Sequence, residues 1–305
     1  MKHWIQAARL RTLPLSLSGI LMGAFLAQSK DSFNWEIFIF SLLTTIAFQI
    51  LSNFANDYGD GIKGTDSSKI GEQRAVASGT ISIKQMKKAI ILTGILSFIF
   101  TIILLYISFL PFFLTEFYIF IALGIACILA AILYTIGKKP YGYLGFGDIF
   151  VFIFFGLIGV CGSEFLYTKS FDLFTILPAA AIGFFSVAVL NLNNMRDMKN
   201  DKIAGKFTLA LYLGIAKSKV YQLIIMFLPF VLCLIYVLKL YPNQYKTLAF
   251  MLLLIPIKAY GRRILEIDKS EEFDPYLKKV ALICLFFTLL FGMGIIDFNF
   301  NEIFK

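Results

Sequence analysis

Two short acidic clusters contain the residues of this chain that are best suited to chemistry. In the first, Asn53 and Asp57 are four residues apart, and Asp57 and Asp60 are three apart. Side chains at these spacings lie on one face of a helix, so three oxygen-bearing groups stack at the end of a long apolar run. Carboxylates at membrane depth are costly unless a cation pairs with them, which makes a functional site the default interpretation. A solvated helix end with turn residues would explain the glycines that follow, but not the stacked oxygens.

A second cluster repeats the pattern in the other half of the chain. Asn193 and Asp197 are four residues apart, and Asp201 follows four residues later, again after an apolar run. Two such clusters repel each other if they face one another, unless metal ions lie between them. Mg²⁺ usually joins one or two carboxylates to the phosphates of a substrate. We therefore expect Mg²⁺ and a diphosphate between the clusters.

The composition limits the metal chemistry and excludes a soluble protein. The chain has 305 residues with a single histidine, His3, and four cysteines without paired spacing, so hard cations held by oxygen remain. Hydrophobic residues make up 59% and charged residues 15%, whereas about a quarter of a soluble globular protein is charged. The net charge of +9 would suit nucleic acid, but the basic residues are interspersed with hydrophobic spans.

Apolar runs long enough to cross a bilayer recur along the chain. We expect an all-α polytopic membrane protein with about nine transmembrane helices in a single membrane-embedded domain, residues 1–305. The first run lacks a small-residue cleavage site and is expected to be a retained helix rather than a signal peptide. The eighth run is the weakest because it contains Pro256 and Lys258. The expected spans lie near 11–28, 37–57, 87–107, 112–136, 145–166, 173–193, 218–240, 245–260 and 280–297.

The arrangement of these spans follows from the basic residues and from the repetition. Most Lys and Arg residues lie at the N-terminus and in the loops that include both acidic clusters, so these parts are expected to be cytoplasmic and the C-terminus outside. Each cluster closes the second helix of its half of the chain. Helices 1–4 (about 11–136) and helices 5–9 (about 145–297) are therefore expected to form similar halves around a central cavity, with the clusters facing each other.

Cations and aromatic residues near the clusters suit a substrate with a diphosphate head and a hydrocarbon tail. Arg and Lys bind phosphate, although any one of them can equally serve the positive-inside bias alone. Arg74 follows the first cluster and Lys138 lies four residues after Tyr134, which makes them the best candidates. The 34 Phe and 14 Tyr offer ring faces that stabilise a cationic intermediate. The candidate phosphate-binding residues are Lys63, Arg74, Lys138, Lys139, Arg196 and Lys206.

Together, these motifs resemble the signature of the UbiA superfamily of intramembrane prenyltransferases. The resemblance is carried by Asn56-Asp57-Tyr58-Gly59-Asp60-Gly61, by the pair Tyr134 and Lys138, and by Asp197 and Asp201. It extends from about residue 4 to residue 214 and more loosely to the end. The motif NDYGDGIKGTD and the segments 138–156 and 193–214 are most similar to members of the family that prenylate 1,4-dihydroxy-2-naphthoate in menaquinone synthesis.

The resemblance implies a multi-pass protein of the cell (inner) membrane with a cavity open sideways to lipid. It implies that Mg²⁺ is held on a polyprenyl diphosphate by Asn53 and the catalytic residues Asp57, Asp60, Asp197 and Asp201. It also implies phosphate binding by Arg74, Lys138 and Lys206. The family often has a further acid where this chain has Gly64, a role that Asp66 would take. Further candidates for substrate binding are Asn53, Asn56, Lys63, Tyr134 and Asn193.

The implied reaction transfers a polyprenyl chain from its diphosphate to 1,4-dihydroxy-2-naphthoate, with loss of CO₂ and diphosphate, and gives demethylmenaquinone. Another aromatic acceptor, such as 4-hydroxybenzoate, homogentisate or a porphyrin, is an alternative. An ion transporter is a third, but the acids lie at one face beside basic residues rather than at mid-span.

Two further acids bracket the fifth expected span. Asp148 lies on the cytoplasmic side, where a carboxylate within reach of the acceptor would deprotonate or hydrogen-bond its hydroxyl. The competing interpretation is a cap or first-turn acid that the helix dipole favours. Glu164 lies toward the outer end and is expected to be structural.

The expected topology is testable with reporter fusions. Fusions after residues 70, 140, 205 and 270 should report the cytoplasm, and fusions after 31, 169 and 242 the outside, because cytoplasmic loops are rich in Lys and Arg. A cytoplasmic signal after residue 169 would contradict this topology, since the two acidic clusters would then lie on opposite faces.

Overall fold

The described part of the chain folds into a bundle of long helices. The structure is a computed structural model that describes residues 2–63, 74–137 and 140–296, without the side chain of Lys63. The helices of at least thirteen residues are α2 (Leu13–Gln28), α3 (Trp35–Lys63), α4 (Ile83–Phe109), α5 (Leu114–Leu133), α8 (Ile176–Ile203), α9 (Leu209–Leu240), α10 (Leu254–Glu266) and α11 (Asp274–Ile295).

Shorter elements complete the bundle. The π-helical segment η3 continues α6 and leads into α7, so these three elements form one membrane-length helix. The short elements are α1 (Lys2–Ala7), η1 (Leu10–Thr12), η2 (Tyr141–Tyr143), α6 (Gly147–Val151), η3 (Phe152–Gly162), α7 (Ser163–Thr168), η4 (Leu173–Thr175), η5 (Tyr245–Leu253) and η6 (Ser270–Phe273).

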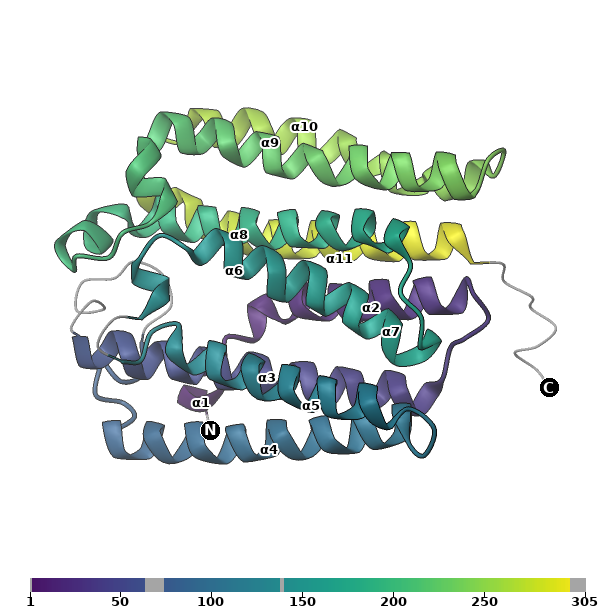
Figure 1. Ribbon diagram of the computed structural model, residues 1–305. Helices are drawn as coiled ribbons and strands as arrows, with labels where there is room; N and C mark the ends of the chain where they lie inside the picture. Colours follow the sequence, from purple (N-terminus) through teal and green to yellow (C-terminus); the bar gives the residue numbers. More distant parts are fainter. Residues whose placement is uncertain (1, 64–73, 138–139, 297–305) are drawn as a thin grey trace.

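The helices are arranged in layers (Figure 1). Helices α9 and α10 lie along one side of the bundle, and α3, α4 and α5 lie along the other. Between them lie α2, α8, α11 and the helix formed by α6, η3 and α7. The main apolar core is built where α8, α9 and α11 meet, and it includes the buried rings of Phe185, Phe230 and Phe287. A separate cluster lines the contact of α3 with α4.

The outer surface of the bundle is apolar, as expected of a protein that lipid surrounds. On α4, Ile91, Leu92 and Ile95 are all more than half exposed. Among the described residues, eight helices are long and apolar enough to cross a membrane. The prediction of an all-α polytopic membrane fold is therefore confirmed.

One expected span differs in form from the others. The stretch near 245–260 is divided between the 3₁₀ segment η5 and the 13-residue helix α10, so it is not among the eight long apolar helices of the described chain. Pro256 lies in the first turn of α10, where a missing backbone N–H leaves no hydrogen bond unmade. Lys258, Arg262 and Arg263 make the rest of this helix polar.

The two acidic clusters lie at the ends of two unusually long helices. The first lies on α3, which has 29 residues, and the second on α8, which has 28. At about 1.5 Å per residue each helix is longer than 40 Å, whereas the hydrocarbon core of a bilayer is about 30 Å thick. Each helix is therefore long enough for one of its ends to extend beyond the hydrocarbon.

Close contact between η3 and α8 depends on glycine. A Cβ atom at Gly156 would lie 2.7 Å from the carbonyl oxygen of Ala179 and 2.7 Å from Cα of Gly183. Small residues allow helix backbones to approach in this way inside membranes. The contact fixes the position of one wall of the central bundle.

Gly156→Ala should therefore destabilise the protein by about 1–3 kcal/mol, the usual cost of overpacking, because backbone atoms cannot move aside. Gly94→Ala in α4 is the matched control, since its Cβ would meet only Leu51 Cδ1 at 3.9 Å. Thermal unfolding of both variants in one detergent measures the difference. Equal midpoints for the two variants would contradict the packing argument.

Candidate functional site

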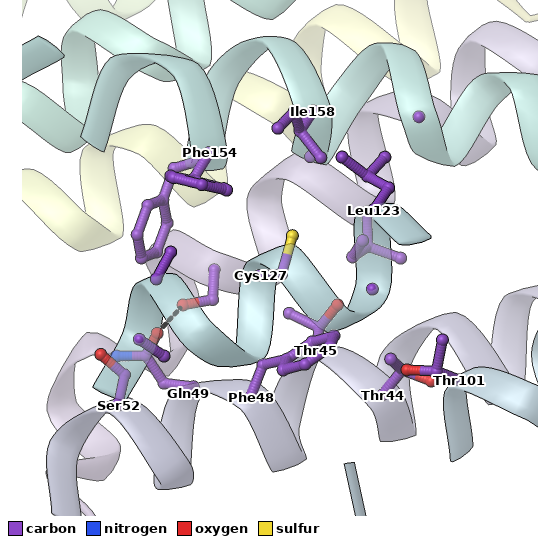
Figure 2. Close-up of a pocket in the computed structure, with 18 of the residues that line it drawn as sticks. Thr44, Thr45, Phe48, Gln49, Ser52, Thr101, Leu123, Cys127, Phe154 and Ile158 are labelled. Carbon is purple, nitrogen blue, oxygen red and sulfur yellow. Dashed lines mark hydrogen bonds between the residues drawn. The ribbon is translucent and has the colours of Figure 1, made fainter. Parts of the chain in front are cut away.

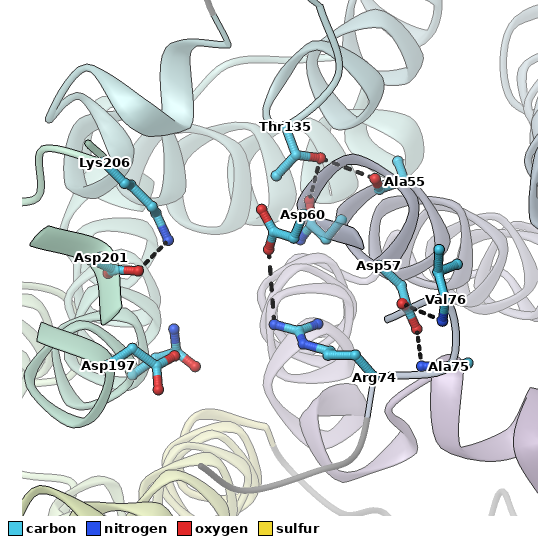
Figure 3. A network of polar contacts seen from close by, with 12 residues as sticks. Ala55, Asp57, Asp60, Arg74, Ala75, Val76, Thr135, Asp197, Asp201 and Lys206 are labelled. Carbon is cyan, nitrogen blue, oxygen red and sulfur yellow. Dashed lines mark hydrogen bonds and ion pairs between the residues drawn. The ribbon is translucent and has the colours of Figure 1, made fainter. Parts of the chain in front are cut away.

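The first acidic cluster is built into the end of α3 and fixes the segment that carries Arg74. Asp57 is buried, and its two carboxylate oxygens accept the backbone N–H groups of Ala75 at 3.0 Å and Val76 at 3.1 Å (Figure 3). A carboxylate that accepts two backbone bonds holds the peptide in place. Asp57 thus anchors the residues that follow Arg74 to the helix.

Asp60 lies one turn further on and contacts two other segments. Its Oδ1 accepts a hydrogen bond from the hydroxyl of Tyr143 at 2.7 Å, and its Oδ2 lies 3.9 Å from an Arg74 nitrogen. Next to it, Gly59 allows α3 to lie close to Thr135, because a Cβ there would lie 2.8 Å from the carbonyl oxygen of Thr135. Asp60 is therefore buried but held between a hydroxyl donor and a cation.

The second cluster, on α8, is held by its own arginine. The Arg196 guanidinium donates from Nε to Asp197 Oδ1 and from a terminal nitrogen to Oδ2, both at 2.8 Å. It also binds the side-chain oxygen of Asn193 at 2.7 Å and contacts Asp274, the first residue of α11. Arg196 was one of the cations considered for phosphate binding, but here it holds Asp197.

Lys206 provides a second cation to the second cluster. Its Nζ lies 3.5 Å from Asp201 Oδ1 and 5.7 Å from the centre of the Tyr143 ring. Burial lowers the pKa of the Lys206 ammonium, but the charges of Asp201, Asp60 and Asp197 outweigh burial and raise it. Carboxylates of both clusters therefore stabilise the charged form of Lys206.

The clusters face each other across a shared space, as the repetition in the sequence predicts. Figure 3 shows Asp60 and Arg74 on one side, with Asp197, Asp201 and Lys206 opposite. In the first cluster Asp57 accepts backbone N–H groups and Asp60 lies beside Arg74, whereas in the second cluster Asp197 is paired with Arg196 and Asp201 lies beside Lys206. The two halves thus hold their carboxylates with different partners.

The donor set suits a hard cation but does not enclose one. Within residues 2–63, 74–137 and 140–296, no group of three or more His, Cys, Asp or Glu side chains is arranged to hold a metal ion. The available donors are carboxylate oxygens, which Mg²⁺ prefers. Because Mg²⁺ usually takes only one or two carboxylates and completes its shell with phosphate and water, this donor set fits Mg²⁺ that arrives with a diphosphate.

An elongated cavity of about 390 Å³ begins beside these clusters. Asn53, Asn56 and Tyr134, all expected to bind substrate, line it. Asn53 donates to the carbonyl of Ala8 at 2.8 Å, and Asn56 accepts from Thr135 at 3.2 Å. The cavity runs between α3 and α5, with α2 and η3 closing it.

The two other acids, Asp148 and Glu164, lie at different places relative to the cavity. The Asp148 carboxylate lies in the first turn of α6 and accepts from the Tyr221 hydroxyl at 3.1 Å. It borders a second, much smaller pocket, which shares Tyr134 with the large cavity. That Asp148 deprotonates or hydrogen-bonds the hydroxyl of the acceptor stays a prediction. Glu164 is buried at the other end in an ion pair with Lys30 at 2.7 Å, as expected of a structural residue.

Some predicted residues lie outside the described part of the chain, and some site residues were not predicted. Lys138, Lys139 and Asp66 lie outside the described residues, as does the side chain of Lys63. Tyr143 and Asp274 were missed. Tyr143 lies in the segment 138–156, which resembles the prenyltransferase family. Nothing in its spacing indicates a hydrogen bond to Asp60, which is 83 residues away.

Known proteins resemble this chain along most of its length. The model of the UbiA prenyltransferase family matches residues 16–291. The 1,4-dihydroxy-2-naphthoate octaprenyltransferase of Haemophilus influenzae is 40% identical over 299 residues, which are 97% of this chain and 96% of that protein. The enzyme of the same name from Escherichia coli is 40% identical over 220 residues, 72% of this chain and 71% of that protein.

Solved structures share the fold at low sequence identity. A UbiA homologue from Archaeoglobus fulgidus bound to DMAPP and Mg²⁺ matches with a TM-score of 0.66 at 14% identity, over 96% of this chain and 98% of that one. A structure of digeranylgeranylglyceryl phosphate synthase matches with a TM-score of 0.59 at 20% identity, over 97% of this chain and 99% of that one.

The pairing of Asp197 with Arg196 predicts unequal effects of removing the two charges of the second cluster. Asp197→Asn should lower the free energy of unfolding by about 3 kcal/mol, because it leaves a buried guanidinium without its main partner. Asp201→Asn should cost clearly less, since Lys206 keeps the attraction of Asp60 and Asp197. Thermal unfolding in detergent compares the variants, and a larger loss for Asp201→Asn would refute the assignment.

Proposed function

We propose an activity for this protein on the basis of its family, because the chain belongs to the UbiA prenyltransferase family. The enzyme transfers a polyprenyl chain from an allylic polyprenyl diphosphate to 1,4-dihydroxy-2-naphthoate in menaquinone synthesis. The relatives from Haemophilus influenzae and Escherichia coli that carry this activity in their names support the acceptor. The observation that carries the proposal is the pair of facing acidic clusters, both with buried cations, next to an apolar cavity that Asn53 and Asn56 line.

The diphosphate would bind between the clusters. Arg74 and Lys206 are buried cations, each within 4 Å of a carboxylate, and they would turn to the phosphate oxygens when the diphosphate arrives. Charge-assisted hydrogen bonds from buried cations stabilise the negative charge that grows on a departing diphosphate. Lys138, whose position is not described, is proposed to join them on the basis of the sequence.

Mg²⁺ is the proposed cofactor. Asp60 and Asp201 would hold it with the diphosphate oxygens, helped by Asn53, Asp57 and Asp197. When bound, Mg²⁺ neutralises the charge of the leaving group and orients it. Because Asp57 and Asp197 already bind protein groups, their release or sharing would accompany loading of the site.

The cavity would protect the allylic cation from water. A series of aromatic rings lines one of its walls, starting with Tyr134 near the clusters. The Tyr134 ring packs edge-on against the Tyr141 ring. The ring centres of Tyr141 and Phe150 are 4.3 Å apart, and Phe150 is stacked with Phe154 at a distance of 6.1 Å between ring centres. Aromatic faces attract cations, and a dry cavity excludes hydrolysis.

The reaction balances without a further reactant. The bond between the allylic carbon and the diphosphate oxygen breaks, and the same carbon bonds to the acceptor ring carbon that bears the carboxylate. Loss of the carboxylate as CO₂ returns its electron pair to the ring, which leaves demethylmenaquinone in its reduced form. The enzyme would act in the cell (inner) membrane, with the N-terminus and both acidic clusters at the cytoplasmic face.

Prenyl transfer by membranes that contain the protein tests this proposal. With polyprenyl diphosphate and 1,4-dihydroxy-2-naphthoate, turnover should require Mg²⁺ or Mn²⁺ and stop when EDTA is added, because the site offers only hard oxygen donors. Asp60→Asn and Asp201→Asn should each lower kcat by at least about 10²-fold, the scale on which loss of one preorganised electrostatic group acts.

Glu36→Gln is the matched control for these variants. Glu36 is an exposed acid at the opposite end of α3, and its loss should leave turnover unchanged. Faster prenylation of 4-hydroxybenzoate or homogentisate than of 1,4-dihydroxy-2-naphthoate would replace the proposed acceptor. Metal flux across vesicles without any prenyl transfer would overturn the enzyme assignment.

A further inference from the structure

The large cavity has two chemically different walls. One wall is a polar stripe on α3, formed by Thr45, Gln49, Ser52 and Asn56. Figure 2 shows Thr45, Gln49 and Ser52 along this helix, with Cys127, Phe154 and Ile158 across the cavity. The stripe leads from the acidic clusters into the apolar interior, because Asn56 and Asp60 are one helical turn apart.

A hydrocarbon tail does not explain this stripe. Polar groups buried against hydrocarbon cost free energy unless their hydrogen-bonding capacity is met, and the protein meets only part of the capacity of Gln49. The lining that the structure describes contains amide and hydroxyl side chains but no charged one. The stripe therefore suits an uncharged polar group, such as the phenolic hydroxyl of an aromatic ring that stacks against the opposite wall.

Gln49, one member of the stripe, is held by hydrogen bonds to two neighbouring side chains. Its Oε1 accepts a hydrogen bond from Ser16 of α2 at 2.6 Å, and its Nε2 donates to the hydroxyl of Thr12 at 3.1 Å. Thr12 in turn donates to the carbonyl of Arg9 at 3.0 Å. A glutamine amide has two hydrogens and two lone pairs to offer. Within the described chain these bonds use one of each, so a donor and an acceptor remain for a ligand in the cavity.

The position of Gln49 also fits the acceptor. Gln49, Asn53, Asn56 and Asp60 follow one another on one helical face. Gln49 lies about 16 Å along the helix axis from Asp60, at about 1.5 Å per residue. That length accommodates a diphosphate bound near Asp60, followed by a two-ring aromatic acceptor at the allylic carbon. The aromatic wall around Phe154 faces the same stretch.

We infer that Gln49 binds a ring hydroxyl of the aromatic acceptor and thereby selects a dihydroxylated ring over one that lacks that hydroxyl. The inference rests on the proposed prenyl transfer and adds the residue that recognises the acceptor. Gln49 turns the ring so that one carbon faces the allylic cation, while Ser16 and Thr12 hold the amide in place.

Acceptor analogues with one hydroxyl removed test this role directly. The preference is the ratio of kcat/KM for 1,4-dihydroxy-2-naphthoate to that for 1-hydroxy-2-naphthoate or 4-hydroxy-2-naphthoate. In Gln49→Leu, the preference over one of these analogues should fall about tenfold, the scale of one hydrogen bond with its unpaired partner. Comparing ratios cancels the intrinsic reactivity of each analogue, and KM for the polyprenyl diphosphate should stay within about twofold.

Gln222→Leu is the matched control. Gln222 is a buried glutamine with two hydrogen-bonded neighbours, Asn191 and Tyr260, in the contact of α9 with α8 and α10, and it does not line the cavity. The same substitution there should lower stability but leave the acceptor preference intact. If Gln49→Leu does not fold, Ser16→Ala keeps the amide while releasing its oxygen, and it should lower the preference in the same direction by a smaller factor.

The outcomes separate this inference from the proposed function. An unchanged preference in Gln49→Leu, or in Ser16→Ala where the first variant fails to fold, would overturn the role of Gln49 while the prenyl transfer stands. A wild-type protein that prenylates none of the three naphthoates would overturn both.

Discussion

The structure depends on the compensation of negative charge where two long helices end. Four buried aspartates lie within a small space, and each has a partner of its own: backbone amides for Asp57, Tyr143 and Arg74 for Asp60, Arg196 for Asp197, and Lys206 for Asp201. Buried carboxylates without such partners would be too costly to keep ionised. The partners come from loops and helices throughout the chain, so the loops must fold back onto the helix ends. The charge requirement therefore shapes the end of the bundle where both acidic clusters lie.

The same arrangement separates two tasks along one helix. The last turns of α3 and α8 carry the charged groups, whereas the earlier turns of α3 line the cavity with neutral amides and hydroxyls. Charge is confined to the place where it is compensated. Deeper in the cavity, uncharged polarity on α3 and aromatic rings on the opposite wall allow an amphipathic acceptor to lie flat between them.

The sequence predicts the long apolar helices and both acidic clusters because these signals are local. Helical spacing within a few residues is enough to place Asp57 beside Asp60. The contacts that complete the site are different, because they join distant residues: Arg11 and Asp274 are 263 positions apart, and Asp60 and Tyr143 are 83 apart. Arg196 misleads in another way. Adjacent residues on a helix do not normally face each other, yet this long side chain folds onto Asp197. The divided stretch near 245–260 also escapes prediction, since hydropathy alone does not distinguish 3₁₀ from α-helical backbone.

The contacts of Asp274 have a consequence for how such a protein changes during descent. Asp274 binds Arg11 at 3.2 Å and also contacts Arg196, so the first segment of the chain and its last helix meet behind the second acidic cluster. A substitution that removes this carboxylate takes one partner from Arg11 and one from Arg196 at once, although Asp197 and Asn193 still hold Arg196. Its effect reaches both the first segment of the chain and the second acidic cluster. We therefore expect substitutions at Asp274 to be tolerated less readily than substitutions on the exposed apolar face of α4.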